Sequence, residues 1–192
     1  MFDAVRQFSE IAQHRSDVLQ RFGLALRGFL LATVHRPYNV DNPENLRAVL
    51  RGFIEIGEPV VLPAHPHTKQ RIAAMGASFS SELAVSNIRL VDQVGYLDML
   101  VLQKNARVIL IDSGGVQKEA FFCGVPCVTL RPETEWVELL QLGVNMLAGG
   151  DPDSLVRAYR TMVDRPISCS SAVYGNGRAS EKIMSNIETD TA

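Results

Sequence analysis

Residues 107–120, RVILIDSGGVQKEA, join an apolar run to an amphipathic one through Asp-Ser-Gly-Gly. The succession predicts a buried strand that turns directly into a helix. Free N–H groups at the start of a helix carry partial positive charge and suit phosphate oxygens, and glycine lets a ligand approach the backbone closely. We therefore expect a phosphate site at Ser113, Gly114 and Gly115.

A second interpretation of the same residues needs no ligand. Ser113 can cap the helix, and the two glycines can form a tight turn. Glu119, one helical turn after Gly115, can accept hydrogen bonds from a ribose or can simply be solvated. The chain has neither a Walker lysine motif nor a G-x-G-x-x-G run, so it indicates neither a P-loop enzyme nor a dinucleotide enzyme.

Outward from this stretch, short apolar runs alternate with longer amphipathic ones. The alternation is typical of βαβ units and predicts an α/β fold with a doubly wound, Rossmann-like parallel sheet in one domain, residues 1–192. The expected strands are Gly28–Val34, Pro59–Pro63, Ile88–Leu90, Arg107–Ile111, Pro126–Leu130 and Val144–Leu147. The expected helices are an N-terminal one containing Phe2 and Leu19, and Pro43–Gly57, Pro66–Gly76, Leu97–Lys104, Gly115–Cys123, Glu135–Leu140, Pro152–Asp164 and Asn176–Ile187.

Ligands of such sheets bind beyond the carboxyl ends of the strands. The polar residues that follow expected strands include His35, Arg36, His65, His67, Arg131, Glu133 and Glu135. A histidine there can donate to a phosphate or exchange a proton near pH 7, and an arginine can bind phosphate through two hydrogen bonds. A structural histidine, a surface ion pair and a solvated carboxylate pair remain open as alternatives.

Composition and charge exclude several classes of protein. The net charge of −2 comes without a basic cluster, so the sequence does not indicate a nucleic-acid partner. The N-terminal residues contain no uninterrupted apolar run, so we expect neither a signal peptide nor a membrane span. The odd set of cysteines, Cys123, Cys127 and Cys169, fits small buried thiols and a cytoplasmic protein. His65 and His67 have no cysteine or carboxylate cluster beside them, so no metal site is expected.

Taken together, these segments resemble the non-hydrolysing UDP-N-acetylglucosamine 2-epimerases. The resemblance covers nearly the whole chain in order, and the succession D-S-G-G, E-A, G-x-P and R-x-x-T-E is specific. The matching segments are 1–4, 33–36, 39–41, 43–46, 65–66, 112–120, 124–126, 131–136 and 174–180.

The resemblance implies one half of a GT-B-type fold, in which two Rossmann-like domains enclose the active site. This chain resembles the C-terminal, UDP-binding domain, with the N-terminal half absent. The full-length enzyme, a homodimer, would interconvert UDP-GlcNAc and UDP-ManNAc for polysaccharide biosynthesis by eliminating and re-adding UDP, without a metal or nicotinamide cofactor. The carboxylates that handle the C2 proton belong to the N-terminal domain, so we expect this chain alone to bind UDP weakly and to lack turnover.

The resemblance also implies roles for single residues. Ser113, Gly114 and Gly115 would hold the diphosphate and Glu119 the ribose. The segment from Gln93 to Met99 would pack on the uracil, and His35, as a catalytic residue, would lie with Arg131 near the phosphates and the sugar. Arg36 and His65 resemble residues that contact a second, regulatory UDP-GlcNAc in bacterial members. Pro37 and Tyr38 replace a stretch that carries a glutamate in the family, which puts the positioning of His35 in doubt.

Three alternatives to this assignment remain. The donor-binding half of a GT-B glycosyltransferase also shows Glu119-Ala120 followed by Gly124-x-Pro126. A hydrolysing UDP-GlcNAc 2-epimerase, which releases free ManNAc and UDP, is a close neighbour in sequence. A non-catalytic UDP-sensing protein would need only the nucleotide site.

Overall fold

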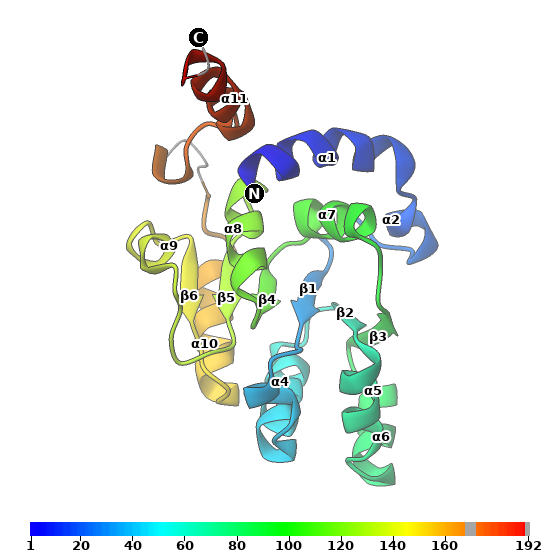
Figure 1. Cartoon of the computed structure of the whole chain (residues 1–192). Coiled ribbons are helices and arrows are strands. Elements are labelled where there is room, and N and C mark those ends of the chain that lie inside the picture. The colour runs from blue at the N-terminus through cyan, green and yellow to red at the C-terminus, as the bar shows by residue number, and fades with distance from the viewer. Residues whose placement is uncertain (168–171, 191–192) are drawn as a thin grey trace.

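The computed structural model describes residues 1–167 and 172–190, so Cys169, one of the expected buried thiols, lies outside the described residues. Six parallel strands form one sheet in the order β3-β2-β1-β4-β5-β6 (Figure 1). The strands are β1 (Leu30–Thr33), β2 (Val60–Ala64), β3 (Ile88–Asp92), β4 (Ile109–Ile111), β5 (Cys127–Thr129) and β6 (Asn145–Leu147). This is the strand order of a Rossmann sheet, and it confirms the predicted doubly wound α/β fold.

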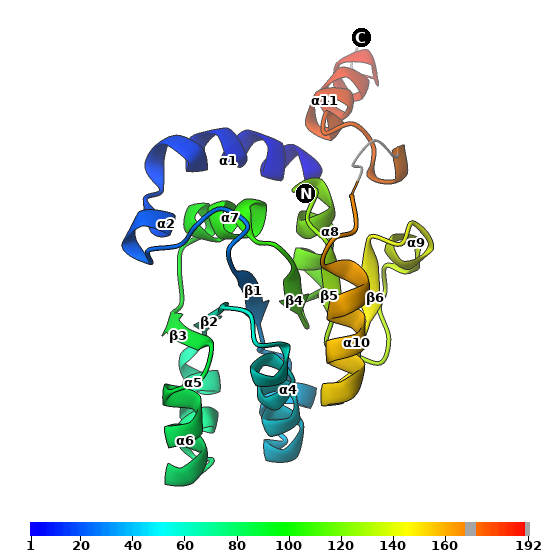
Figure 2. The same ribbon diagram turned by 180° about the vertical axis from the view of Figure 1, so that it is seen from behind.

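Helices cover both faces of the sheet. They are α1 (Phe2–Arg15), α2 (Val18–Arg21), α3 (Pro37–Val40), α4 (Pro43–Ile56), α5 (Pro66–Ala73), α6 (Ala77–Ala84), α7 (Tyr96–Asn105), α8 (Gly114–Phe122), α9 (Val137–Gln141), α10 (Pro152–Met162) and α11 (Ala179–Asp190), with a short 3-10 helix η1 (Ala172–Tyr174). Helices α1, α2, α7 and α8 lie on one face, and α4, α5, α6 and α10 lie on the other (Figures 1 and 2).

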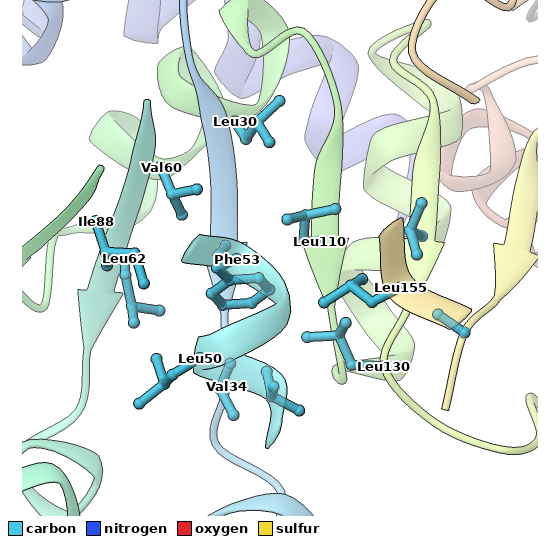
Figure 3. Close-up of a cluster of buried hydrophobic side chains, with 14 of the residues drawn as sticks. Leu30, Val34, Leu50, Phe53, Val60, Leu62, Ile88, Leu110, Leu130 and Leu155 are labelled. Atoms are coloured by element: carbon cyan, nitrogen blue, oxygen red, sulfur yellow. The ribbon is translucent and has the colours of Figure 1, made fainter. Parts of the chain in front are cut away.

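Strands β1, β2, β4 and β5 are buried along their whole length, and their residues are mainly apolar because both of their faces are covered. The edge strand β3 exposes Arg89 and Asp92. In β1, Leu30 and Ala32 pack on the side of α4 and α10, whereas Leu31 packs on the side of α1 and α7. Figure 3 shows Phe53 and Leu50 of α4 over the strands of the first cluster. The side chains that alternate along each strand thus fill two separate cores.

Helix α4 shows how local sequence sets the bounds of an element. The side chain of Asn42 accepts hydrogen bonds from the backbone N–H groups of Glu44 and Asn45, and Gly57 ends the helix with φ of 77°. Between these ends, Gly52 lets α10 approach closely, because a Cβ at this position would lie 2.6 Å from Cδ2 of Leu155. The glycine therefore fixes the contact between two helices of the same face.

The structure corrects several expected bounds. All six expected strands are found: β1, β4, β5 and β6 are shorter than expected, β2 is shifted by one residue, and β3 continues to Asp92. The short helices α2, α3 and α6 were not predicted as separate elements. Helix α5 ends at Ala73 because the backbone of Gly76, with φ of 94°, starts α6 in a new direction. The last helix begins at Ala179 instead of Asn176, because Gly177 adopts φ of 70°.

The first and last helices meet. Oδ2 of Asp3, in α1, accepts hydrogen bonds from the backbone N–H of Ser180 at 2.9 Å and from its hydroxyl at 3.1 Å, so that Asp3 caps α11 from a distant part of the chain. Figures 1 and 2 show α11 extending away from the sheet above this contact. Across residues 1–167 and 172–190, no helix has both the length and the apolar character needed to cross a membrane.

The two cysteines that can be placed differ in burial. Cys127 lies in the core, where burial raises the pKa of its thiol to about 12, which matches the expected inert thiol. Cys123 is only half-buried, so the expectation of a buried thiol is wrong there.

Candidate functional site

A cavity of about 540 Å³ opens at the carboxyl end of the sheet. The chain leaves neighbouring strands β1 and β4 toward opposite faces, to α4 and α8, and this divergence creates a crevice between them. The cavity is lined by Thr33, Val34, His35, Pro63, His65, His67, Thr68, Gln93, Met99, Ser113 and Val116. Five of the predicted site residues, His35, His65, Gln93, Met99 and Ser113, are thus brought together.

The buried carboxylate of Asp112 organises one wall of this crevice. Its oxygens accept hydrogen bonds from the backbone N–H groups of His35 and Arg36, at 3.0 and 2.9 Å, and from Nδ2 of Asn39 at 3.1 Å. Burial raises the pKa of Asp112, but the hydrogen bonds from His35, Arg36 and Asn39 outweigh burial and hold the pKa below its ordinary value of 3.8. The group is therefore a carboxylate that fixes the loop after β1.

The same carboxylate holds the ring of His35. Nδ1 of His35 lies 3.0 Å from Oδ1 of Asp112, while 48% of the His35 side chain stays exposed. Sequence comparison put this positioning in doubt because of Pro37 and Tyr38. The structure supplies a different support, since Asn39 bonds both Asp112 and the backbone oxygen of Leu130. With Nδ1 bound, Nε2 is the ring nitrogen left to act on a ligand.

At the start of α8, Ser113 lines the cavity, whereas the predicted Gly114 and Gly115 do not, and Gly114 is buried. Ser113 occupies the N-cap position, yet its hydroxyl makes no capping hydrogen bond within the described structure, so its interpretation as a plain helix cap is wrong. The first N–H groups of α8 have no partner inside the helix. Gly114 lies beside Trp136, whose Nε1 donates to the Gly114 backbone oxygen at 2.8 Å, and Gly115 faces Met1. This geometry suits an anion.

Glu119 lies one turn further along α8, outside the cavity lining. Its Oε2 accepts a hydrogen bond from Nε2 of Gln103 at 2.9 Å, and Gln103 itself is buried in α7. Burial raises the pKa of Tyr96, and the nearby carboxylate of Glu119 raises it further. Glu119 is thus a fixed, half-buried acceptor between α7 and α8.

Neither of the predicted arginines, Arg36 and Arg131, lines the cavity. Arg131 binds the carboxylate of Glu135 through both of its Nη atoms, at 3.0–3.1 Å. Nη2 of Arg36 lies 3.8 Å from the place that a Cβ of Gly114 would take, and its buried Nε has no hydrogen-bond partner in the part of the chain that the structure describes. Arg36 therefore lies next to the helix start, apart from His65 in the cavity.

His65 and His67 take part in separate local contacts. Nδ1 of His65 accepts from the backbone N–H of His67 at the start of α5, and Nε2 of His67 lies 2.8 Å from Oδ1 of Asp41, which also binds Arg71. Within residues 1–167 and 172–190, no three His, Cys, Asp or Glu side chains gather to hold a metal ion.

Sequence reasoning missed a polar network beneath the loop after β5. Oε1 of the buried Gln117 accepts hydrogen bonds from the hydroxyl of Thr134 at 2.6 Å and from Nδ2 of Asn145 at 3.0 Å. Oδ1 of Asn145 in turn accepts from the hydroxyl of Thr129. Polar residues inside predicted strands and helices were the available signal, because buried polar groups need partners. The network ties the loop at Arg131–Trp136 to α8.

The comparison with known proteins identifies related sequences over nearly the whole chain. Residues 1–188 match the model of the family described as UDP-N-acetylglucosamine 2-epimerase. The chain is 44% identical over 165 residues to UDP-2,3-diacetamido-2,3-dideoxy-D-glucuronate 2-epimerase of Pseudomonas aeruginosa, covering 84% of this chain and 45% of the relative. It is 36% identical over 188 residues to UDP-N-acetylglucosamine 2-epimerase of Methanocaldococcus jannaschii, covering 95% and 51%.

Solved structures also match this chain over nearly its whole length. The Methanocaldococcus jannaschii UDP-GlcNAc 2-epimerase in complex with UDP-GlcNAc and UDP matches with a TM-score of 0.85 at 34% identity, over 98% of this chain and 52% of that one. The chain therefore spans about half the length of the relatives it matches. Its fold is that of one half of a GT-B-type protein.

Proposed function

Because this chain belongs to the UDP-N-acetylglucosamine 2-epimerase family, we propose that it is the nucleotide-binding, C-terminal half of an enzyme that interconverts UDP-GlcNAc and UDP-ManNAc. The observation that carries the proposal is the crevice between β1 and β4, which meets the start of α8 at Ser113. A solved relative with the same fold was crystallised with UDP-GlcNAc and UDP, which supports a uridine nucleotide as the ligand.

The nucleotide lies across α7 and α8 in this proposal. The N–H groups of Gly114 and Gly115 and the hydroxyl of Ser113 bind the diphosphate, since the helix start favours negative charge. The carboxylate of Glu119 accepts from the ribose hydroxyls. The segment 93–99 covers the uracil, with Gln93 and Met99 already lining the cavity.

In this reaction the nucleotide-binding half stabilises the leaving group, UDP. In the forward direction the C2 proton leaves the sugar as the bond between C1 and the UDP oxygen breaks, which gives a glycal and UDP. In the second step UDP adds back to C1 of the glycal, and a proton is delivered to C2 on the opposite face. The start of α8, with Arg131 and the ring of His35 nearby, stabilises the negative charge that develops on UDP.

The remaining catalytic groups lie elsewhere in this proposal. The base that takes the C2 proton belongs to the N-terminal half, and about half of each relative's length lies outside its match to this chain. The chain alone then binds UDP without turnover. Retention of the glycal until UDP re-adds makes the enzyme non-hydrolysing, and the full-length protein forms a homodimer.

A second candidate substrate follows from one specific observation. The chain shares 44% identity with an epimerase named for UDP-2,3-diacetamido-2,3-dideoxy-D-glucuronate, against 36% with a UDP-N-acetylglucosamine 2-epimerase. The two sugars differ away from C2, at a 3-acetamido group and a carboxylate, so both can undergo the same elimination and re-addition. The UDP site described above serves either substrate.

The test combines the chain with a separately produced N-terminal half of a relative in deuterated water. Each UDP-sugar is supplied in turn, and deuterium at C2 is followed by NMR. The proposal predicts deuterium uptake together with the C2-epimer, and faster uptake identifies the preferred sugar. Transfer of sugar to an acceptor without exchange would instead indicate a glycosyltransferase, and release of free ManNAc would indicate a hydrolysing enzyme.

Binding of UDP to the chain alone, measured by calorimetry, tests the nucleotide site independently of assembly with the N-terminal half.

A further inference from the structure

We propose that Glu135 is an internal competitor of the nucleotide: in the free chain its carboxylate occupies Arg131 beside the start of α8, and the diphosphate must displace it. The inference rests on the proposed function, which supplies the identity of the ligand. It assigns to Glu135 an effect on the affinity of the site and on which ligands the site prefers.

The ion pair between Arg131 and Glu135 resembles the way in which an arginine binds an anionic ligand. Nη1 of Arg131 donates to both oxygens of Glu135, at 3.1 and 3.0 Å, and Nη2 donates to Oε1 at 3.1 Å. A bidentate arginine fork matches a carboxylate and a phosphate equally well. While Glu135 is bound, the Nη1–Nη2 edge of Arg131 is taken and cannot receive a second anion.

The carboxylate also lies at the start of the helix. Oε2 of Glu135 is 3.6 Å from the place that a Cβ of Gly114 would take, and Nη2 of Arg36 is 3.8 Å from the same place. Glu135 therefore lies near Arg131 and the positive end of α8, which are groups proposed to receive the diphosphate, and Arg36 lies beside them. The Arg131 hydrogen bond and the charge of Arg36 lower the pKa of Glu135, so the carboxylate is charged at neutral pH.

The two partners differ in their freedom to move. The Arg131 side chain is 16% exposed, whereas that of Glu135 is 50% exposed. The residues on either side of Glu135 are held through their side chains, because the Thr134 hydroxyl donates to Gln117 and Nε1 of Trp136 donates to the Gly114 backbone oxygen. Rotation of the Glu135 side chain into solvent would therefore free Arg131 without moving the loop.

Displacement has a consequence for ligand choice. A uridine nucleotide with a diphosphate carries enough charge to replace the carboxylate at Arg131, whereas uridine carries none. Glu135 therefore lowers the affinity for every ligand that must take Arg131 and leaves the affinity for uridine unchanged. It also assists release of the diphosphate, because the carboxylate returns to the arginine as the ligand leaves.

The test compares Glu135→Gln with Glu133→Gln by calorimetry against UDP and uridine. Glu133 is exposed and lies on the same loop, so the second variant removes the same charge without touching Arg131. We expect Glu135→Gln to bind UDP about tenfold more tightly than the unchanged chain, a difference of about 1.4 kcal/mol. We expect no change for uridine, and no change for either ligand with Glu133→Gln.

Two outcomes separate the inference from the function on which it rests. Failure of the unchanged chain to bind UDP overturns the proposed function. Binding of UDP by the unchanged chain that Glu135→Gln leaves equal or weaker overturns the role of Glu135 alone. If Glu135→Gln does not fold, a crystal of the unchanged chain with UDP decides the question. Glu135 turned away from Arg131 supports the inference, and a persisting bidentate pair contradicts it.

Discussion

Nδ1 of His35 lies 3.0 Å from Oδ1 of Asp112. This contact joins the ends of β1 and β4, the neighbouring parallel strands between which the strand order reverses. His35 follows β1 and Asp112 follows β4, so their contact crosses the crevice at its base. An aspartate that binds one ring nitrogen of a histidine fixes the ring and leaves the other nitrogen for a ligand. Asp112 thus positions His35 and is not itself a ligand in this account.

Replacing Asp112 by Asn should destabilise the chain in a pH-dependent way. The folded pKa of Asp112 lies below 3.8, so its stabilisation is present above that value and is lost as the pH falls through the folded pKa. We expect Asp112→Asn to lower the free energy of unfolding by about 2–4 kcal/mol at neutral pH, because buried charge-assisted hydrogen bonds are lost. Urea unfolding at neutral and acidic pH measures the difference, which should shrink in acid.

A suitable control for this prediction is Asp41→Asn. Asp41 also binds a histidine and an arginine, and its pKa is lowered chiefly by its hydrogen bond to His67, but it is exposed. Its replacement should change stability far less than that of Asp112. Equal losses in the two variants, or a loss with Asp112→Asn that does not depend on pH, would show that the buried hydrogen bonds are not the cause.

Gly114→Ala should separate binding from folding. The added methyl group would make only ordinary contacts, the closest being 3.5 Å to Nε1 of Trp136, so we expect the stability to change little. The methyl group would nevertheless stand where the diphosphate approaches the start of α8. We expect UDP affinity to fall about tenfold, as for the loss of one hydrogen bond to a charged oxygen. Gly150→Ala, which adds a methyl group in open space, should bind UDP normally.

Glu119→Ala should remove discrimination for the ribose. The carboxylate is held by Gln103 at 2.9 Å, so it is preorganised to accept from the two ribose hydroxyls. We expect the unchanged chain to prefer UDP over 2′,3′-dideoxy-UDP by about tenfold and the variant to bind both alike. Competition calorimetry with the two ligands gives the ratio. A variant that keeps the preference would place the ribose elsewhere.

Gly52→Ala should destabilise the fold although alanine favours helices. The new Cβ would lie 2.6 Å from Cδ2 of Leu155 and 3.3 Å from Cα of Pro152, and one of these contacts is with backbone. Overpacking costs about 1–3 kcal/mol, against a gain of about 1 kcal/mol in helix propensity. We expect a net loss in thermal unfolding. The further change Leu155→Ala should cost less in this variant than in the unchanged chain, and a net gain from Gly52→Ala alone would contradict the close packing.

The sheet and the position of the site could be predicted from the sequence, because strands buried on both faces leave long apolar runs and their carboxyl ends share one edge. Ser113 was placed in this way, whereas Met99 was predicted only from the family resemblance. The partners of Asp112 and Gln117 could not be predicted, since a buried polar residue shows that a partner exists without showing which one. The pairing of Glu135 with Arg131 could not be predicted for a similar reason. In the sequence Glu135 was interpreted as one of a carboxylate pair with Glu133, and the structure shows it bound to Arg131.

The most direct test of the account is a crystal structure of this chain soaked with UDP. The account predicts diphosphate oxygens within about 3 Å of the N–H groups of Gly114 and Gly115, with the ribose hydroxyls on Glu119. UDP bound away from α8, or an empty site at saturating UDP, would contradict it.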